Sequence, residues 1–195
     1  VMAFAKPLPS EQDKARARHE LGLDADALVG MFIGSAYGPN LQAAEFIHND
    51  LAPLVPQATL VVAGGVGLGM KSRHKNVVVT GQLSEDDKQR WLTACDFAIN
   101  PMMSGSGTNI KMFDFMAQRL PTVTTAVGAR GIDTGGREAF MLVEPTAEAF
   151  AQAIEQLKDP ARRLDLGQSA RLCVEEGYAW ERISRQLGCF VQARQ

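Results

Sequence analysis

The feature that most constrains the fold of this chain is a regular alternation between short, almost wholly apolar segments and segments of helical character. Strands that are apolar along their whole length are typical of a parallel sheet that helices cover on both faces. We therefore predict an α/β fold, a Rossmann-like doubly wound parallel sheet followed by C-terminal helices. Strands are predicted at residues 28–33, 58–63, 76–80, 96–100, 121–125 and 140–143. Helices are predicted at residues 10–21, 39–54, 84–94, 108–118, 146–157, 160–176 and 179–191.

Capping residues mark the ends of several predicted helices. Ser10 is a suitable N-cap for the first helix, and Gly22 is a suitable stop. Pro39 stands in the first turn of the second helix, where its missing N–H costs little. Ser84 is followed by three acidic residues, a pattern that favours a helix N-terminus.

The length of 195 residues suits one compact α/β domain. We predict a linker and an N-terminal helix over residues 1–27 and the Rossmann-like domain over residues 28–195. The first residues, from Val1 to Pro7, form an extended, proline-containing stretch that resembles a cut through a linker. We therefore expect a further domain to precede this one in a longer chain.

Charge and composition argue against several classes of protein. The net charge of −2 gives no support to nucleic-acid binding, which usually requires a basic surface. No apolar run reaches the roughly 18–20 residues that a transmembrane helix needs. The three cysteines are far apart and lack the spacing of metal ligands, so we expect reduced thiols, a cytoplasmic protein and no metal site.

In a doubly wound sheet, ligands bind at the carboxyl ends of the strands. This rule points to three loops, at residues 34–40, 80–84 and 102–111. Two glycine-containing stretches near this edge resemble other motifs only superficially. The glycines at 64–69 have the wrong spacing for a dinucleotide fingerprint, and the stretch around Ser106 lacks the first glycine of a hydrolase elbow and the Gly-Lys-Ser/Thr ending of a P-loop.

The most informative stretch runs from a predicted strand through a small-residue loop into a predicted helix. Small residues let a ligand approach the backbone closely, and the first N–H groups of a helix favour an anion such as a diphosphate. Thr108, Lys111 and Asp114 are spaced three apart and are predicted to share one helical face. Lys111 could then bind phosphate oxygens while Asp114 accepts hydrogen bonds from a ribose. The alternative is that Lys111 and Asp114 form an ordinary surface ion pair and that the loop is a connector.

This stretch resembles the signature of the group 1 (family 4) retaining glycosyltransferases of the GT-B fold. The matching residues are Gly105-Ser106-Gly107-Thr108, Lys111, Asp114, Met116-Ala117, Pro121, Val123 and Thr125. Weaker matches follow in the expected order: Phe32-Ile33-Gly34-Ser35 with Pro39-Asn40, Thr80-Gly81-Gln82-Leu83-Ser84, and Ala179-Trp180.

The resemblance implies that residues 28–195 are the donor-nucleotide-binding half of a two-domain enzyme. Such an enzyme transfers a hexose-type sugar from a nucleoside-diphosphate sugar to an acceptor, with retained anomeric configuration and without a metal or other cofactor. The acceptor would be held by an N-terminal domain, so this half alone should bind the sugar nucleotide and catalyse little. The expected location is the cytoplasm, with peripheral association at the inner membrane face through the N-terminal domain as an alternative.

The resemblance also assigns the predicted donor site, with Lys111 as its catalytic residue. The site comprises Gly34, Ser35, Gly81, Gln82, Leu83, Ser106, Gly107, Thr108, Asn109, Lys111 and Asp114.

Three residues depart from the family pattern. Asp114 replaces the glutamate usually assigned to the ribose, and Ser106 replaces the glutamate that usually meets the transferred sugar. Ser35 stands where many members carry an arginine for the diphosphate. Ser106 and Ser35 leave open a catalytically silent sugar-nucleotide-binding module. A sugar-nucleotide epimerase of the same fold is a separate alternative.

Overall fold

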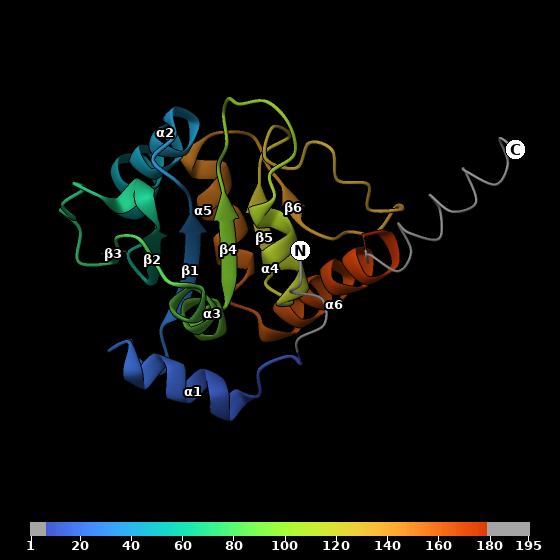
Figure 1. Cartoon of the computed structure of the whole chain (residues 1–195), viewed down its shortest axis with the longest axis horizontal. Coiled ribbons are helices and arrows are strands. Elements are labelled where there is room, and N and C mark those ends of the chain that lie inside the picture. Colours follow the sequence, from blue (N-terminus) through green and yellow to red (C-terminus); the bar gives the residue numbers. More distant parts are fainter. Residues whose placement is uncertain (1–6, 179–195) are drawn as a thin grey trace, which may run out of the picture.

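The computed structural model describes residues 7–178 and contains a six-stranded parallel sheet with the strand order β3-β2-β1-β4-β5-β6 (Figure 1). This order confirms the predicted Rossmann-like, doubly wound α/β fold. The first two strands match the prediction residue for residue, and the others are shorter at their ends. The strands are β1 (Leu28–Ile33), β2 (Ala58–Ala63), β3 (Val77–Val79), β4 (Phe97–Asn100), β5 (Thr122–Thr124) and β6 (Met141–Leu142).

The order of the strands reverses between β1 and β4, which lie side by side in the sheet. β1 pairs with β2 along its whole length but with β4 only at Gly30 and Met31. The loops that leave β1 and β4 therefore diverge to opposite faces. Such a switch point opens a crevice at the carboxyl edge of the sheet, where ligands bind in folds of this kind.

Among the described residues, six α-helices surround the sheet: α1 (Glu11–Glu20), α2 (Gly38–Phe46), α3 (Glu85–Ala94), α4 (Lys111–Ala117), α5 (Ala147–Gln156) and α6 (Pro160–Gly177). Alternate residues along the strands point to opposite faces, so the sheet contributes to two separate apolar clusters. Phe32 packs in one cluster with residues of α2 and α5. Met31 packs in the other with residues of α3 and α4. The continuously apolar strands are thus covered on both faces, as their sequence predicted.

Two predicted helices differ from the observed ones, and a third lies outside the described residues. The second predicted helix is α-helical only to Phe46 and continues as a π turn (Ile47–Leu51) and a 3₁₀ turn (Ala52–Leu54). Pro53 lies in this last turn and has no N–H to continue the α-helical ladder. The helix predicted from residue 108 begins at Lys111. The helix predicted at 179–191 is beyond the part of the chain that the structure describes.

The predicted caps of α1 and α3 are confirmed. The hydroxyl of Ser10 accepts a hydrogen bond from the backbone N–H of Asp13, whose carboxylate in turn accepts from the Ser10 N–H. Ser84 accepts from the backbone N–H of Asp87 in the same way. Gly22 follows α1 with φ +67°, a conformation that side chains disfavour.

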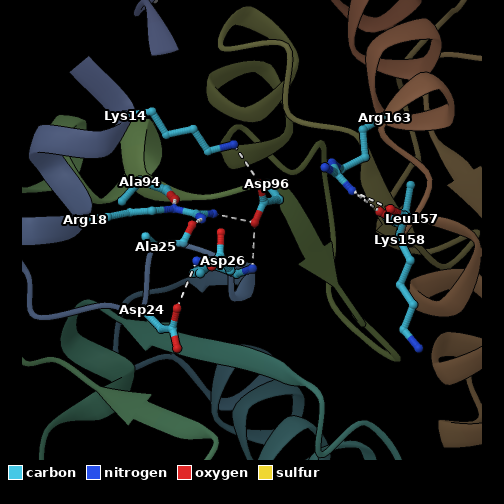
Figure 2. A network of polar contacts seen from close by, with 11 residues as sticks. Lys14, Arg18, Asp24, Ala25, Asp26, Ala94, Asp96, Leu157, Lys158 and Arg163 are labelled. Atoms are coloured by element: carbon cyan, nitrogen blue, oxygen red, sulfur yellow. Dashed lines mark hydrogen bonds and ion pairs between the residues drawn. The ribbon is translucent and has the colours of Figure 1, made fainter. Parts of the chain in front are cut away.

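A buried carboxylate joins α1 to the amino end of the sheet (Figure 2). Asp96, just before β4, accepts hydrogen bonds from Arg18 at 2.6 Å, from Lys14 at 2.6 Å and from the backbone N–H of Val29 at 2.7 Å. Arg18 also donates to the carbonyl of Ala94. Both oxygens of this buried carboxylate are therefore hydrogen-bonded, and its charge faces two cations. These contacts hold α1 at the amino edge of the sheet (Figure 1).

Candidate functional site

A cavity of about 570 Å³ lies at the carboxyl edge of the sheet, between the loops that follow β1 and β4. Seven of the predicted site residues line it: Gly34, Ser35, Ser106, Thr108, Asn109, Lys111 and Asp114. The cavity therefore coincides with the crevice expected at the switch point of the sheet.

Lys111 is the first residue of α4, and its half-buried side chain extends into this cavity. Its ammonium donates a hydrogen bond of 2.8 Å to Oδ1 of Asn40 and lies 4.4 Å from the centre of the Phe32 ring. Burial lowers the pKa of Lys111 to about 8. No carboxylate pairs with this ammonium in the part of the chain that the structure describes. The lysine is thus mostly protonated at neutral pH, and its charge is not compensated.

Asp114 lies one turn further along α4 and faces Lys88 of α3. Lys88 makes ion pairs with Asp114 at 3.3 Å and with Glu85 at 3.0 Å. Burial of Lys88 works against its charge, but these two carboxylates outweigh it and raise its pKa. Lys111 and Asp114 therefore each have another partner, and the surface ion pair between them is absent from the described structure.

The loop at residues 104–110 forms one wall of the cavity. Gly105 and Gly107 have φ values of +125° and +79°, outside the helical region, and α4 begins only at Lys111. Thr108 therefore lies in the loop before α4, so the prediction of a shared helical face with Lys111 and Asp114 was wrong. Among the described residues, none of the backbone N–H groups from 105 to 110 donates a hydrogen bond, so they are available to a ligand.

Contacts with the loop after β5 hold the 104–110 loop in place. Arg130 donates to the carbonyl oxygens of Gly105 at 2.7 Å and Gly107 at 3.4 Å. The side-chain amide of Asn109 donates to the carbonyl of Val127 at 3.3 Å. The two loops thus form one continuous wall.

A buried polar network supports both loops from beneath. The hydroxyl of Thr125 donates to the carbonyl of Met102 and accepts from the backbone N–H of Gly128 at 3.1 Å. The side-chain amide of Asn100, at the end of β4, donates to the Gly128 carbonyl at 3.2 Å. A Cβ atom at position 128 would lie 2.2 Å from the hydroxyl of Thr124, so only glycine fits there.

The other four predicted site residues, Gly81, Gln82, Leu83 and Gly107, are not among those that line the cavity. The carbonyl of Gly81 accepts a hydrogen bond of 3.2 Å from the N–H of Gly64. A Cβ atom at Gly65 would lie 3.4 Å from Oε1 of Gln82 and 3.6 Å from the Cα of Ser35. The 80–84 loop is therefore separated from the loop after β1 by the turn that begins at Gly64.

The glycine-rich run at residues 64–69 forms that turn. Residues Gly65–Gly67 form a 3₁₀ turn, and Val66 donates its N–H to the carbonyl of Gly34 at 3.0 Å. A Cβ atom at Gly67 would lie 2.0 Å from the carbonyl oxygen of Thr80. The glycines thus allow three loops to pack closely, and the run does not open a helix as a dinucleotide fingerprint does.

Sequence reasoning missed Asn40, Lys88 and Arg130, which also line the cavity. Each follows a strand that was predicted to point at this edge: Asn40 after β1, Lys88 after β3 and Arg130 after β5. Their position relative to Lys111 depends on how helices and loops pack, which no local pattern reveals.

Comparison with known proteins identifies the family. A family model described as "Glycosyl transferases group 1" matches residues 27–159, more than half of the chain and a range that includes every predicted site residue. This chain belongs to the group 1 glycosyltransferases. The resemblance seen around residues 105–125 is thereby confirmed.

Individual relatives of this glycosyltransferase chain are distant. It is 26% identical over 180 residues to a putative teichuronic acid biosynthesis glycosyltransferase, TuaC, of Bacillus subtilis, covering 86% of this chain and 44% of TuaC. The structure of Anabaena HepE in complex with UDP has a TM-score of 0.77 and 16% identity, covering 98% of this chain and 54% of HepE. The C-terminal domain of LpcC from Francisella tularensis, a group 1 family protein, has a TM-score of 0.65 and 18% identity, covering 89% of this chain and 96% of that domain.

The structural similarities show that this glycosyltransferase chain has the fold of one GT-B half. The chain spans less than half of the curated relatives that it matches, 43% and 44% of their lengths. In residues 7–178 no helix is long and apolar enough to cross a membrane. The same residues contain no cluster of three or more His, Cys, Asp or Glu side chains that could hold a metal ion.

Proposed function

We propose that this chain is the donor-binding half of a glycosyltransferase and that it binds a nucleoside-diphosphate sugar in the 570 Å³ cavity. The observation that carries the proposal is the uncompensated ammonium of Lys111, placed one helical turn from the carboxylate of Asp114. Asp114 would accept hydrogen bonds from the ribose, and Lys111 would bind the diphosphate. Family membership and the fold shared with HepE, which was crystallised with UDP and with UDP-glucose, support this assignment.

Lys111 is the residue we propose to be catalytic. When the bond between the sugar and the diphosphate breaks, negative charge grows on the departing phosphate. A half-buried cation that is already in place stabilises that charge more in the transition state than in the ground state. The free N–H groups of the 104–110 loop would add hydrogen bonds to the same oxygens. This mechanism requires no metal ion and, by family likeness, retains the anomeric configuration.

The acceptor site belongs, in this proposal, to a domain that precedes residue 1, so residues 1–195 should bind a donor and transfer little. We also propose a cytoplasmic location. The buried thiols of Cys95 and Cys173 are both free, which fits a reducing compartment.

Binding tests the proposal directly. Calorimetry or ligand-observed NMR against uridine, guanosine, adenosine and thymidine diphosphates, without Mg²⁺, should show one preferred base. Because the proposed N-terminal domain would supply the other half of the cleft, we expect dissociation constants from the high micromolar to the millimolar range for residues 1–195, about −4 to −6 kcal/mol. No detectable binding of any of the four diphosphates at millimolar concentrations would contradict the proposal.

A second candidate, a silent binding module, is favoured by Ser106. This residue lines the cavity at the position where a carboxylate would meet the transferred sugar, and a hydroxyl cannot replace that charge. Product analysis of the full-length protein with the base selected by the panel separates the two functions. Transfer to an acceptor supports the glycosyltransferase, whereas binding without turnover supports the silent module.

A further inference from the structure

Arg130 brings a second cation to the cavity. It lies in the loop after β5, and its exposed side chain reaches the 104–110 loop, where Nη2 donates to the carbonyl oxygens of Gly105 and Gly107. Those contacts use one nitrogen of the three. Neither Nε nor Nη1 donates to any residue that the structure describes. Because a guanidinium has five N–H donors in a planar fork, Arg130 retains donors for a ligand while it holds the loop.

The place of Arg130 follows from the course of the chain. Asp114 lies one turn inside α4, Lys111 is its first residue, and the carbonyls that Arg130 binds belong to the loop that enters the helix. The backbone next to Arg130 packs tightly on this loop, since a Cβ atom at Gly131 would lie 2.4 Å from the hydroxyl of Thr108. Asp114, Lys111 and Arg130 all line the same cavity, Asp114 and Lys111 from α4 and Arg130 through its contacts with the loop that enters α4.

Arg130 and Lys111 differ in their ion pairing from Lys88, the third cation that lines the cavity. Lys88 is held by two carboxylates, Glu85 and Asp114. Within residues 7–178, neither Arg130 nor Lys111 forms an ion pair. Two uncompensated cations thus line one cavity, which matches a ligand that carries more than one anionic group.

We propose that Arg130 determines ligand specificity by binding an oxyanion at the end of the cavity away from Asp114. The oxyanion is either the second phosphate of a nucleoside diphosphate or a carboxylate on the attached sugar, because a guanidinium fork binds both in the same bidentate way. Ser106 lies between the two glycines whose carbonyls Arg130 binds, and its side chain carries no charge to repel such a group. This inference rests on the proposed function, and it adds a residue that the family signature does not contain.

The test compares three variants with the wild-type chain. Arg130→Gln keeps an N–H donor for the loop but removes the charge, and Arg130→Lys keeps the charge. Arg16→Gln removes a positive charge from α1, at the opposite edge of the sheet, and serves as the matched control. Affinities are measured for UMP, UDP, UDP-glucose and UDP-glucuronate, or for the same series on another base if the panel selects one, beside each melting temperature.

Two outcomes support the proposal and identify the oxyanion. If Arg130 binds the second phosphate, Arg130→Gln lowers the affinity for UDP and for both sugar nucleotides about tenfold, and the affinity for UMP by less than about threefold. If it binds a sugar carboxylate, only the affinity for UDP-glucuronate falls about tenfold. In either case Arg130→Lys restores much of the affinity and Arg16→Gln changes nothing.

Two other outcomes overturn it. Equal losses of affinity for all four ligands, together with a lower melting temperature, would show that Arg130 only holds the 104–110 loop in place. Unchanged affinities in Arg130→Gln would remove it from the site altogether. Failure of the wild-type chain to bind any ligand of the series would instead overturn the proposed function, on which this inference depends.

Discussion

The ammonium of Lys111 lies 2.8 Å from Oδ1 of Asn40, so a cation from α4 is held by a neutral amide from α2 across the crevice. A carboxylate in place of Asn40 would neutralise the lysine and compete with a phosphate for it. The amide orients the ammonium and leaves its charge for a ligand. Half-burial of this charge lowers the stability of the unliganded protein, because it lowers the pKa of Lys111 to about 8.

Replacing Lys111 by Met should stabilise the chain and weaken diphosphate binding. The lowered pKa of about 8 means that the fold disfavours the charged ammonium. An apolar side chain of similar length should raise the free energy of unfolding by about 1–2 kcal/mol. One pKa unit corresponds to about 1.4 kcal/mol, and the partial exposure of Lys111 screens part of the shift from 10.5 to about 8. Affinity for a nucleoside diphosphate should fall about tenfold or more, and affinity for the nucleoside should not change. Chemical denaturation and calorimetry measure the two effects, and a less stable variant, or equal losses for both ligands, would contradict the prediction.

Diphosphate binding should weaken as the pH rises through about 8, where Lys111 loses its proton. Stability should show the opposite trend. Between pH 8 and the ordinary lysine pKa of 10.5, the unfolded chain still binds a proton that the native chain has released, so the contribution of Lys111 to unfolding free energy rises with pH. Calorimetry from pH 7.5 to 9 measures the binding, with Lys111→Arg as the control that stays charged. The same pH profile in both proteins would exclude Lys111 as its cause.

Asp114→Asn should weaken the binding of the nucleoside and of the nucleoside diphosphate equally, because the proposed partner of Asp114 is the ribose that both contain. Hydrogen bonds to a charged group contribute about 1.5–3 kcal/mol, so the loss should be about tenfold or more. Asp114→Glu keeps the charge with a longer reach and should bind within about threefold of wild type. Should the Asn variant bind both ligands normally, the carboxylate would have only the structural role of holding Lys88.

Asp96→Asn should destabilise the fold without changing ligand affinity, because Asp96 lies at the edge of the sheet opposite the cavity. The change leaves Arg18 buried without its carboxylate, and breaking a buried ion pair costs about 3–5 kcal/mol. Glu20→Gln is the matched control, since it breaks an exposed pair between α1 and Arg90 that should contribute at most about 1 kcal/mol. Thermal and chemical melts measure both, and similar losses in the two variants would show that burial of Asp96 is not what makes its pair important.

Much of the fold could be predicted from the sequence because its signals are local. The apolar runs at β1 and β2 predicted those strands to the residue, and Ser10 and Ser84 predicted the starts of two helices through hydrogen bonds that span three residues. The rule that ligands bind at the carboxyl ends of the strands then indicated the loop before α4. Helical spacing predicted that Lys111 and Asp114 lie one turn apart on α4, independently of the rest of the chain.

What the tertiary structure alone decided is which groups the two charged residues of α4 meet. Lys111 contacts Asn40, which is 71 positions away in the chain, and Asp114 pairs with Lys88, 26 positions away. Arg130 reaches Gly105 from 25 positions away. The loop that precedes α4 is likewise held by distant contacts, from Arg130 to Gly105 and from Asn109 to Val127. Sequence periodicity reports which face of a helix or strand is buried, but partners across a crevice are set by the packing of separate elements, and that packing exists only in the folded chain.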